Sequence, residues 1–287
     1  MRSISDLMDD AIREKSERES AKREQNAWHV SSLMSCLSGV YHQRMGNKPE
    51  FNARQLRIFE VGHQTEELMI KYLGDKVVET QIDVKFPQFD LVGHADAVID
   101  DGEYCRLVEC KSQNSKSFWW MMKEGTDAKP EHVVQTALYY KYIEKHRPDL
   151  FKRLDPEKPA CVVYFSKDDL CIKEVPLFRE RLDEAAEVGR QRVLLLNAAW
   201  NTKVPPEPAP SIIEERGKHK LNWLARFCSV HHLCTNNPNW LVEAELEVTK
   251  LNADAKKSVQ IEKPKRSKKK GTPNSDGEGT GKTTEEK

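Results

Sequence analysis

The sequence lacks both a long hydrophobic run and a net charge. No stretch of the 287 residues approaches the roughly 18 consecutive apolar residues of a transmembrane helix. The opening residues, MRSISDLMDD, hold no apolar signal core, so we expect no export by that route. The formal net charge of zero argues against a strongly basic protein that coats DNA. These absences favour a cytoplasmic protein with no membrane segment.

Cysteine is too scattered for a secreted disulfide framework. The seven cysteines are odd in number and widely spaced along the chain. In a reducing compartment they are expected to be core residues or metal ligands. Glycine-rich loops of the Walker type are also missing from the sequence, so any helicase acting with this protein would be a separate chain.

Large apolar residues are scarce at both ends of the chain. Residues 1–27 are dominated by charge and are interpreted as a charged helix or extension. Residues 250–287 are predicted to be a disordered charged tail, because they offer little apolar surface to offset their ordering entropy. The tail holds a basic block, Lys263 to Lys270, which is either a solubilising segment or a weak nucleic-acid anchor. Residues 28–245 are then expected to form one domain.

Hydrophobic periodicity predicts an ordered series of elements between these ends. The segment 51–75 has a helical pattern, with Ile58, Val61, Leu68 and Tyr72 near one stripe. Alternating and β-branched residues then predict strands, and two further helical segments follow. The remaining predictions are strands over 76–86, 89–100 and 103–112, a helix over 130–146, a hairpin over 160–177, a helix over 178–200 and a proline-rich linker over 204–210. This order predicts an α/β (α+β) core with a mixed central β-sheet flanked by helices.

The central hairpin brings together three charged residues. With the turn placed on residues 101–102, Asp96 pairs with Leu107, and Glu109 and Lys111 follow on the same face by alternation. Two carboxylates beside a lysine repel each other unless a cation relieves them. Mg²⁺ or Mn²⁺ prefers such oxygen ligands and can activate a water for attack on a phosphate. The alternative is an exposed, charged hairpin with no ligand.

The chain resembles the RecB-like branch of the PD-(D/E)XK nuclease superfamily, which includes AddB nuclease domains and CRISPR-associated iron–sulfur exonucleases. The resemblance spans about residues 28–235 and rests on the order and spacing of five motifs. These motifs are VSSLMSCLSGVYHQRMG, FEVGHQTEE, GHADAVI, LVECKSQ and QTALYY. It implies a restriction-endonuclease-like fold.

The resemblance also implies roles for individual residues. Asp96 and Glu109 would be metal ligands together with the backbone carbonyl of Cys110, and Lys111 would be the catalytic lysine. Gln135 and Tyr139, four apart on one helix face, would steady the water, the lysine or the DNA backbone, unless they are ordinary packing residues.

The first motif departs from the family pattern. Glu66 stands where a histidine is usual, and a glutamate is an oxygen ligand suited to Mg²⁺. His63 and His94 lie nearby in the sequence but are interpreted as structural.

The stretch WLARFCSVHHLC, within a segment of about residues 221–245, resembles half of the iron–sulfur site of this branch. Cys36, Cys228 and Cys234 match three of the four ligands, while Ala225 stands where the fourth cysteine belongs. His231 or His232 would complete the set, or zinc would be held instead. The remaining alternative is that the cysteines form a clasp without metal.

The resemblance predicts a divalent-metal-dependent DNA nuclease. It favours an exonuclease acting on DNA ends or single strands in recombination, repair or phage DNA processing, with a separate helicase or recombination protein as a partner. Phe118, Trp119 and Trp120 either stack bases or form an aromatic core cluster. The alternatives are a site-specific endonuclease, a catalytically silent DNA-binding or assembly subunit of the same fold, and a metal-stabilised nucleic-acid-binding module centred on the cysteines.

Overall fold

The computed structural model describes residues 2–22, 26–47, 49–123, 125 and 127–261. The helices are α1 (Ile4–Lys22), α2 (Leu37–Arg44), α3 (Ala53–Leu73), α4 (Ser115–Lys123), α5 (Pro130–His146), α6 (Pro148–Phe151), α7 (Arg179–Thr202), α8 (Trp223–Arg226), α9 (His231–Thr235) and α10 (Trp240–Ile261). The strands are β1 (Trp28–His29), β2 (Val77–Phe86), β3 (Leu91–Asp100), β4 (Cys105–Gln113), β5 (Ala160–Ser166), β6 (Ile172–Leu177), β7 (Ile212–Glu215) and β8 (Lys218–Leu221). The helix α10 continues past residue 250, where the tail was expected to begin, and the basic block Lys263 to Lys270 lies outside the described residues.

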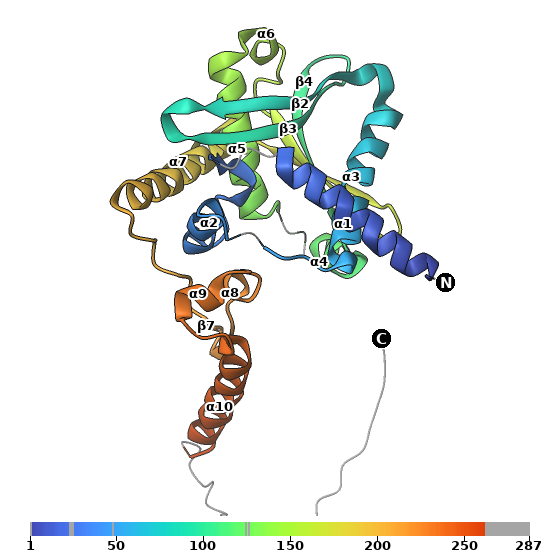
Figure 1. Ribbon diagram of the computed structural model, residues 1–287. Helices are drawn as coiled ribbons and strands as arrows, with labels where there is room; N and C mark the ends of the chain where they lie inside the picture. The colour runs from blue at the N-terminus through green and yellow to red at the C-terminus, as the bar shows by residue number, and fades with distance from the viewer. Residues whose placement is uncertain (1, 23–25, 48, 124, 126, 262–287) are drawn as a thin grey trace, which may run out of the picture.

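A six-stranded mixed sheet organises the larger part of the molecule (Figure 1). β3 pairs antiparallel with β2 and β4, and β1 runs parallel to the start of β3. β4 and β5 are parallel, and the crossover between them passes through α4, α5 and α6. β5 and β6 form the predicted second hairpin. The predicted α/β fold with a mixed central sheet flanked by helices is confirmed.

The register of the β3–β4 hairpin differs from the sequence prediction. Val98, rather than Asp96, lies opposite Leu107. The turn is longer than expected, because the Asp101 N–H donates to the Tyr104 carbonyl at 3.0 Å and Gly102 takes a φ of 102°. Since the shift keeps the alternation, the face of each β4 side chain is unchanged.

Two hydrophobic clusters lie against the sheet. The larger one joins Leu107 to buried residues of α5 and α7. The smaller one contains Met69 of α3 with Val108 and Cys110 of β4. Glu109 and Lys111 alternate with these residues and therefore share the face of Leu107.

The helix α3 buries a different stripe from the predicted one. Its buried residues are Ala53, Leu56, Thr65 and Met69. Ile58, Val61 and Tyr72, three of the four predicted core residues, are exposed. The position of the sheet decides which side of the helix is buried, and the sequence period alone cannot give that orientation.

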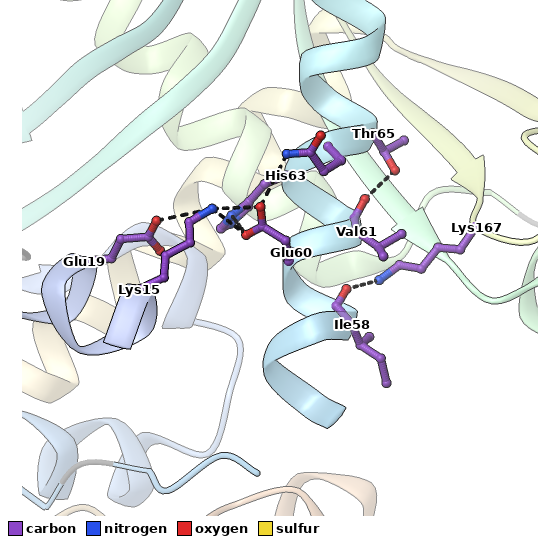
Figure 2. Close-up of polar contacts among 9 residues, drawn as sticks. Lys15, Glu19, Ile58, Glu60, Val61, His63, Thr65 and Lys167 are labelled. Carbon is purple, nitrogen blue, oxygen red and sulfur yellow. Dashed lines mark hydrogen bonds and ion pairs between the residues drawn. The ribbon is translucent and has the colours of Figure 1, made fainter. Parts of the chain in front are cut away.

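α1 lies across α3 (Figure 1) and has no buried residue. Figure 2 shows Lys15 reaching Glu60 of α3, with the Lys15 Nζ 2.7 Å from the carboxylate. Arg57 of α3 forms a second ion pair with Asp9 of α1. On the other side of α3, Lys167 donates to the Ile58 carbonyl at 2.6 Å (Figure 2). Charged contacts therefore hold the N-terminal helix in place.

The C-terminal elements form a smaller group below the sheet in the view of Figure 1. Residues 203–211 connect α7 to β7 without regular structure, as predicted for a proline-rich linker. The β7–β8 hairpin, which the sequence did not predict, pairs Ile212 with Leu221. Asn252 of α10 bonds both the N–H and the carbonyl of His219, so the long helix is fastened to this hairpin. Among the described residues, no helix combines the length and apolar character needed to cross a membrane.

Candidate active site

Three charged side chains meet on adjacent strands β3 and β4. The pairing of Ala97 with Val108 places the preceding Asp96 beside Glu109. The Cys110 N–H donates to Asp96 Oδ2 at 2.7 Å, which ties the Asp96 carboxylate to β4. Lys111 Nζ lies 2.5 Å from Glu109 Oε1. The structure thus brings together Asp96, Glu109 and Lys111 as the alternation predicted, although the register differs.

Burial strongly perturbs both carboxylates. Loss of solvent, followed by the charge of Glu109, holds the pKa of Asp96 well above its ordinary range. Loss of solvent also raises the pKa of Glu109, and Lys111 opposes this rise. The carboxylate charge of Glu109 in turn raises the pKa of Lys111 against the effect of burial. Lys111 is therefore held as a cation beside Glu109.

Glu109 has the donor atoms that a cation would use. Its side chain is 1% exposed, and apart from the Lys111 ion pair neither carboxylate oxygen has a hydrogen-bond partner within the described part of the chain. The short contact to Lys111 is an ion pair at Oε1. A buried carboxylate with unsatisfied lone pairs is costly. Asp96 on β3 and Glu109 on β4, the strand that also carries the Cys110 carbonyl, therefore fit a divalent cation.

A full protein cage for a metal is not present. Within the described ranges, no group of three or more His, Cys, Asp or Glu side chains is arranged to hold a metal ion. Mg²⁺ commonly takes only one or two carboxylates and fills its other positions with water and substrate phosphates. Two carboxylates at this site are consistent with that mode of binding.

Glu66 lies on α3, the helix that packs against β4 through Met69. Its carboxylate accepts a hydrogen bond from the Gln81 amide of β2. The charge of Glu66 nevertheless contributes to the raised pKa of both Asp96 and Glu109, so it belongs to the same electrostatic site. The nearby histidines face elsewhere: His63 lies 3.9 Å from Glu60 and His94 lies 3.1 Å from Asp83, and both imidazoles are exposed.

Gln135 and Tyr139 project from α5 towards the charged residues. The Gln135 amide donates to the Tyr139 hydroxyl at 3.2 Å, and both side chains are buried. Burial, followed by the charge of Glu109, raises the pKa of Tyr139, so its hydroxyl stays protonated. Gly93 of β3 allows this approach, because an added Cβ would lie 2.9 Å from the Tyr139 hydroxyl.

A third α5 residue, which the sequence reasoning missed, joins this group. His132 Nδ1 lies 2.8 Å from the Tyr164 hydroxyl, and Tyr164 pairs with Lys111 across β4 and β5. Burial and then the charge of Lys111 lower the pKa of His132 to about 3, so the imidazole is neutral. His132 lies three residues before Gln135 and seven residues before Tyr139, so it is on the same helical face. That spacing is the signal in the sequence that could have identified His132 as part of the site.

The three aromatic residues after β4 lie in three different environments. Phe118 is fully buried and belongs to the larger core cluster. The Trp119 indole N–H donates to Asp169 at 2.9 Å. Trp120 is 61% exposed. The core alternative is therefore correct for Phe118, while Trp120 keeps a ring face free.

The three predicted cysteines of the clasp do come together. A hydrogen bond from Cys228 lowers the pKa of Cys36 to about 5, and the charge of Cys234 acts on Cys228. Cys234 Sγ lies 3.1 Å from Ser38 Oγ beside α2. The segment that follows the linker is thereby fastened to the start of α2.

This arrangement does not support an iron–sulfur cluster or a zinc site. Ala225 is fully buried and offers only a methyl group where a fourth thiolate would be needed. His231 Nε2 is engaged by Ser211 Oγ at 3.0 Å, and His232 is exposed. Among the described residues, the three cysteines are not part of any group of side chains that could hold a metal ion.

Comparisons with known proteins relate the chain to one family. The family model of the PD-(D/E)XK nuclease superfamily matches residues 2–235. No match was found among curated proteins. Among solved structures, the protein SSO0001 is 17% identical with a TM-score of 0.47, covering 82% of this chain and 97% of its own. An alkaline exonuclease from Laribacter hongkongensis is 16% identical with a TM-score of 0.43, covering 62% of this chain and 91% of its own.

The structural likenesses are too distant to add to the assignment, which rests on the sequence match. That match covers the strands with Asp96, Glu109 and Lys111 as well as α5 and the cysteine segment up to residue 235. The RecB-like branch remains a resemblance, and the site does not reproduce that branch's iron–sulfur ligands. The chain belongs to the PD-(D/E)XK nuclease superfamily.

Proposed function

We propose that the protein is a divalent-metal-dependent nuclease that hydrolyses DNA phosphodiesters. We further propose an exonuclease that acts on DNA ends or single strands. The observation that carries the proposal is the buried Glu109 carboxylate, which lies beside Asp96 and, apart from its ion pair with Lys111, has no hydrogen-bond partner among the described residues. In this family setting, such a carboxylate is best explained as a ligand kept ready for a cation.

The side chains of the site have separable tasks. Bound Mg²⁺ or Mn²⁺ would supply an activated water and stabilise charge on the phosphate. Asp96 and Glu109 would hold the cation, with the Cys110 carbonyl and Glu66 as further oxygen donors. Lys111 stays cationic and can neutralise charge that develops on the phosphate. The Tyr139 hydroxyl, which already accepts from Gln135, keeps its own proton to donate.

The test is incubation of end-labelled single- and double-stranded DNA with Mg²⁺ or Mn²⁺. Glu109→Ala and Lys111→Ala should each lower the cleavage rate by at least about 100-fold, as loss of a charge-stabilising group does. Glu103→Ala, an exposed carboxylate in the turn of the same hairpin, should cleave like the wild type. EDTA should abolish cleavage.

The products separate the alternatives. Release of nucleotides from ends, with circular DNA left intact, supports an exonuclease, and nicked circles at fixed positions support a site-specific endonuclease. If the wild type and the two variants give identical traces while DNA still binds, the protein is a silent DNA-binding subunit. The biological setting in repair, recombination or phage DNA processing, and a separate helicase as partner, stay predictions.

A further inference from the structure

A cavity of about 490 Å³ opens at the end of β4, next to the charged site. Its wall includes Gln113, Lys116, Trp120, Met121 and Lys129. The lining is mainly apolar, and the exposed Trp120 ring stands at its edge. A mainly apolar cavity bordered by an indole can hold a planar aromatic ligand.

The strand geometry connects this cavity to the catalytic face. Gln113 follows Lys111 by two residues on β4, so both side chains point to one face at a separation of about 7 Å. Tyr164, the neighbour of Lys111 on β5, accepts a hydrogen bond from the Lys129 N–H at 3.0 Å. The cavity therefore begins about 7 Å from Lys111 along β4.

The charges around the cavity suit a phosphate backbone. Lys116 and Lys129 are exposed, and neither is ion-paired within the residues the structure covers. The one acidic residue of the lining, Asp127, is neutralised by Arg181 at 2.5 Å. The border of the cavity thus keeps two unpaired positive charges.

We propose that this cavity receives an unpaired base of the DNA strand beside the scissile phosphate. Trp120 stacks on the base, and Lys116 and Lys129 pair with the flanking phosphates. The inference rests on the proposed function for the identity of the strand as DNA. It assigns to Trp120 a binding role that its neighbour Trp119 cannot share, because the Trp119 indole is bonded to Asp169 and does not line the cavity.

The test compares Trp120→Ala with Trp119→Ala in binding a fluorescent single-stranded oligonucleotide, with EDTA present to prevent cleavage. Loss of one base–aromatic stack should weaken binding by about 5- to 150-fold, the equivalent of about 1–3 kcal/mol. Trp119→Ala, a matched change on the same helix, should stay within about two-fold of the wild type. Trp120→Phe, which keeps a ring, should recover most of the affinity. Thermal unfolding checks that each variant is folded.

A series of oligonucleotides, each with one abasic position, locates the base. At one position, the abasic substitution should weaken binding to the wild type as strongly as Trp120→Ala does. The same substitution should have no effect on binding to Trp120→Ala. Equal effects of the two tryptophan variants, or no abasic position that matters, would overturn the proposal. If binding depends on Trp120 but Mg²⁺ and Mn²⁺ give no cleavage, the nuclease proposal fails and the base site stands. If cleavage is normal and binding ignores Trp120, the base site fails alone.

Discussion

At the residue scale, Asp96 and Glu109 form part of the candidate site while lowering the stability of the fold. Glu109 is buried and Asp96 is half-buried on adjacent strands, and loss of solvent raises the pKa of each. Keeping them ionised near neutral pH without a cation therefore destabilises the folded chain. Lys111 offsets part of this effect, since its charge opposes the rise in both pKa values.

The first prediction concerns Asp96→Asn and pH. Because the folded pKa of Asp96 lies above its ordinary value of 3.8, the folded state binds this proton more tightly than the unfolded state. Stability of the wild type should therefore fall as pH rises from about 4 to about 7 in EDTA, relative to Asp96→Asn, which has no such proton. Thermal unfolding of both proteins across this range measures the difference. If the stabilities of the two proteins change with pH in parallel, the pKa of Asp96 is not raised in the folded state.

The second prediction concerns Gly93→Ala. The new Cβ would lie 2.8 Å from Tyr139 Cε1 and 3.2 Å from Val30 Cβ, so Tyr139 must move. We expect a loss of about 1–3 kcal/mol in the free energy of unfolding. Gly62→Ala is the control, because its Cβ would meet only the Ser112 hydroxyl at 3.2 Å. Denaturant unfolding measures both, and equal stabilities would show that Tyr139 does not depend on Gly93.

At the scale of elements, α1 differs from the helices around the sheet. It buries no residue and lies on α3 through the Lys15–Glu60 and Arg57–Asp9 ion pairs (Figure 2 shows the first). Exposed ion pairs contribute only about 0–1 kcal/mol each and weaken with salt. α1 is therefore the element most easily released from the core.

The third prediction follows from this weak attachment. Trypsin should cleave within α1 faster at about 0.5 M salt than at about 0.05 M, because the ion pairs are screened. Glu60→Gln should give the faster cleavage even at low salt. The main thermal transition should stay nearly constant, since no core residue is involved. Time courses analysed by mass spectrometry measure the cleavage, and a rate independent of both salt and Glu60 would show that other contacts hold α1.

At the scale of the whole molecule, two groups of elements meet at the start of α2. Cys36 accepts a hydrogen bond from the Ala209 N–H of the linker, and Ser38 contacts Cys234. Gly39 completes this clasp, because its missing side chain leaves room for Cys228. The clasp brings the segment after the linker against the nuclease core.

The fourth prediction tests this clasp. In Gly39→Ala the new Cβ would lie 2.7 Å from Cys228 Sγ, and we expect a loss of about 1–3 kcal/mol in stability. In an unobstructed helix the same change would stabilise, because alanine is the better helix former. The double variant Gly39→Ala with Cys228→Ala removes the obstructing sulfur and should recover stability. A rise in the melting temperature of Gly39→Ala itself would show that the clasp does not pack as described.

The sequence predicted the parts of the site that depend on short-range periodicity. Alternation placed Glu109 and Lys111 on one face of β4 and Cys110 on the other, because the two-residue period of a strand is fixed by its backbone. Helical spacing in the same way placed Gln135 and Tyr139 together on α5. The β2–β4 strands and the second hairpin followed from β-branched runs and turn residues.

Only the tertiary structure decided features that depend on distant contacts. The turn at Gly102 set the true β3–β4 register, and the position of the sheet chose which side of α3 is buried. It also buried Phe118 and Ala225 while leaving Trp120 exposed. Burial and charge neighbours arise from packing between segments far apart in the chain, so no local pattern encodes them.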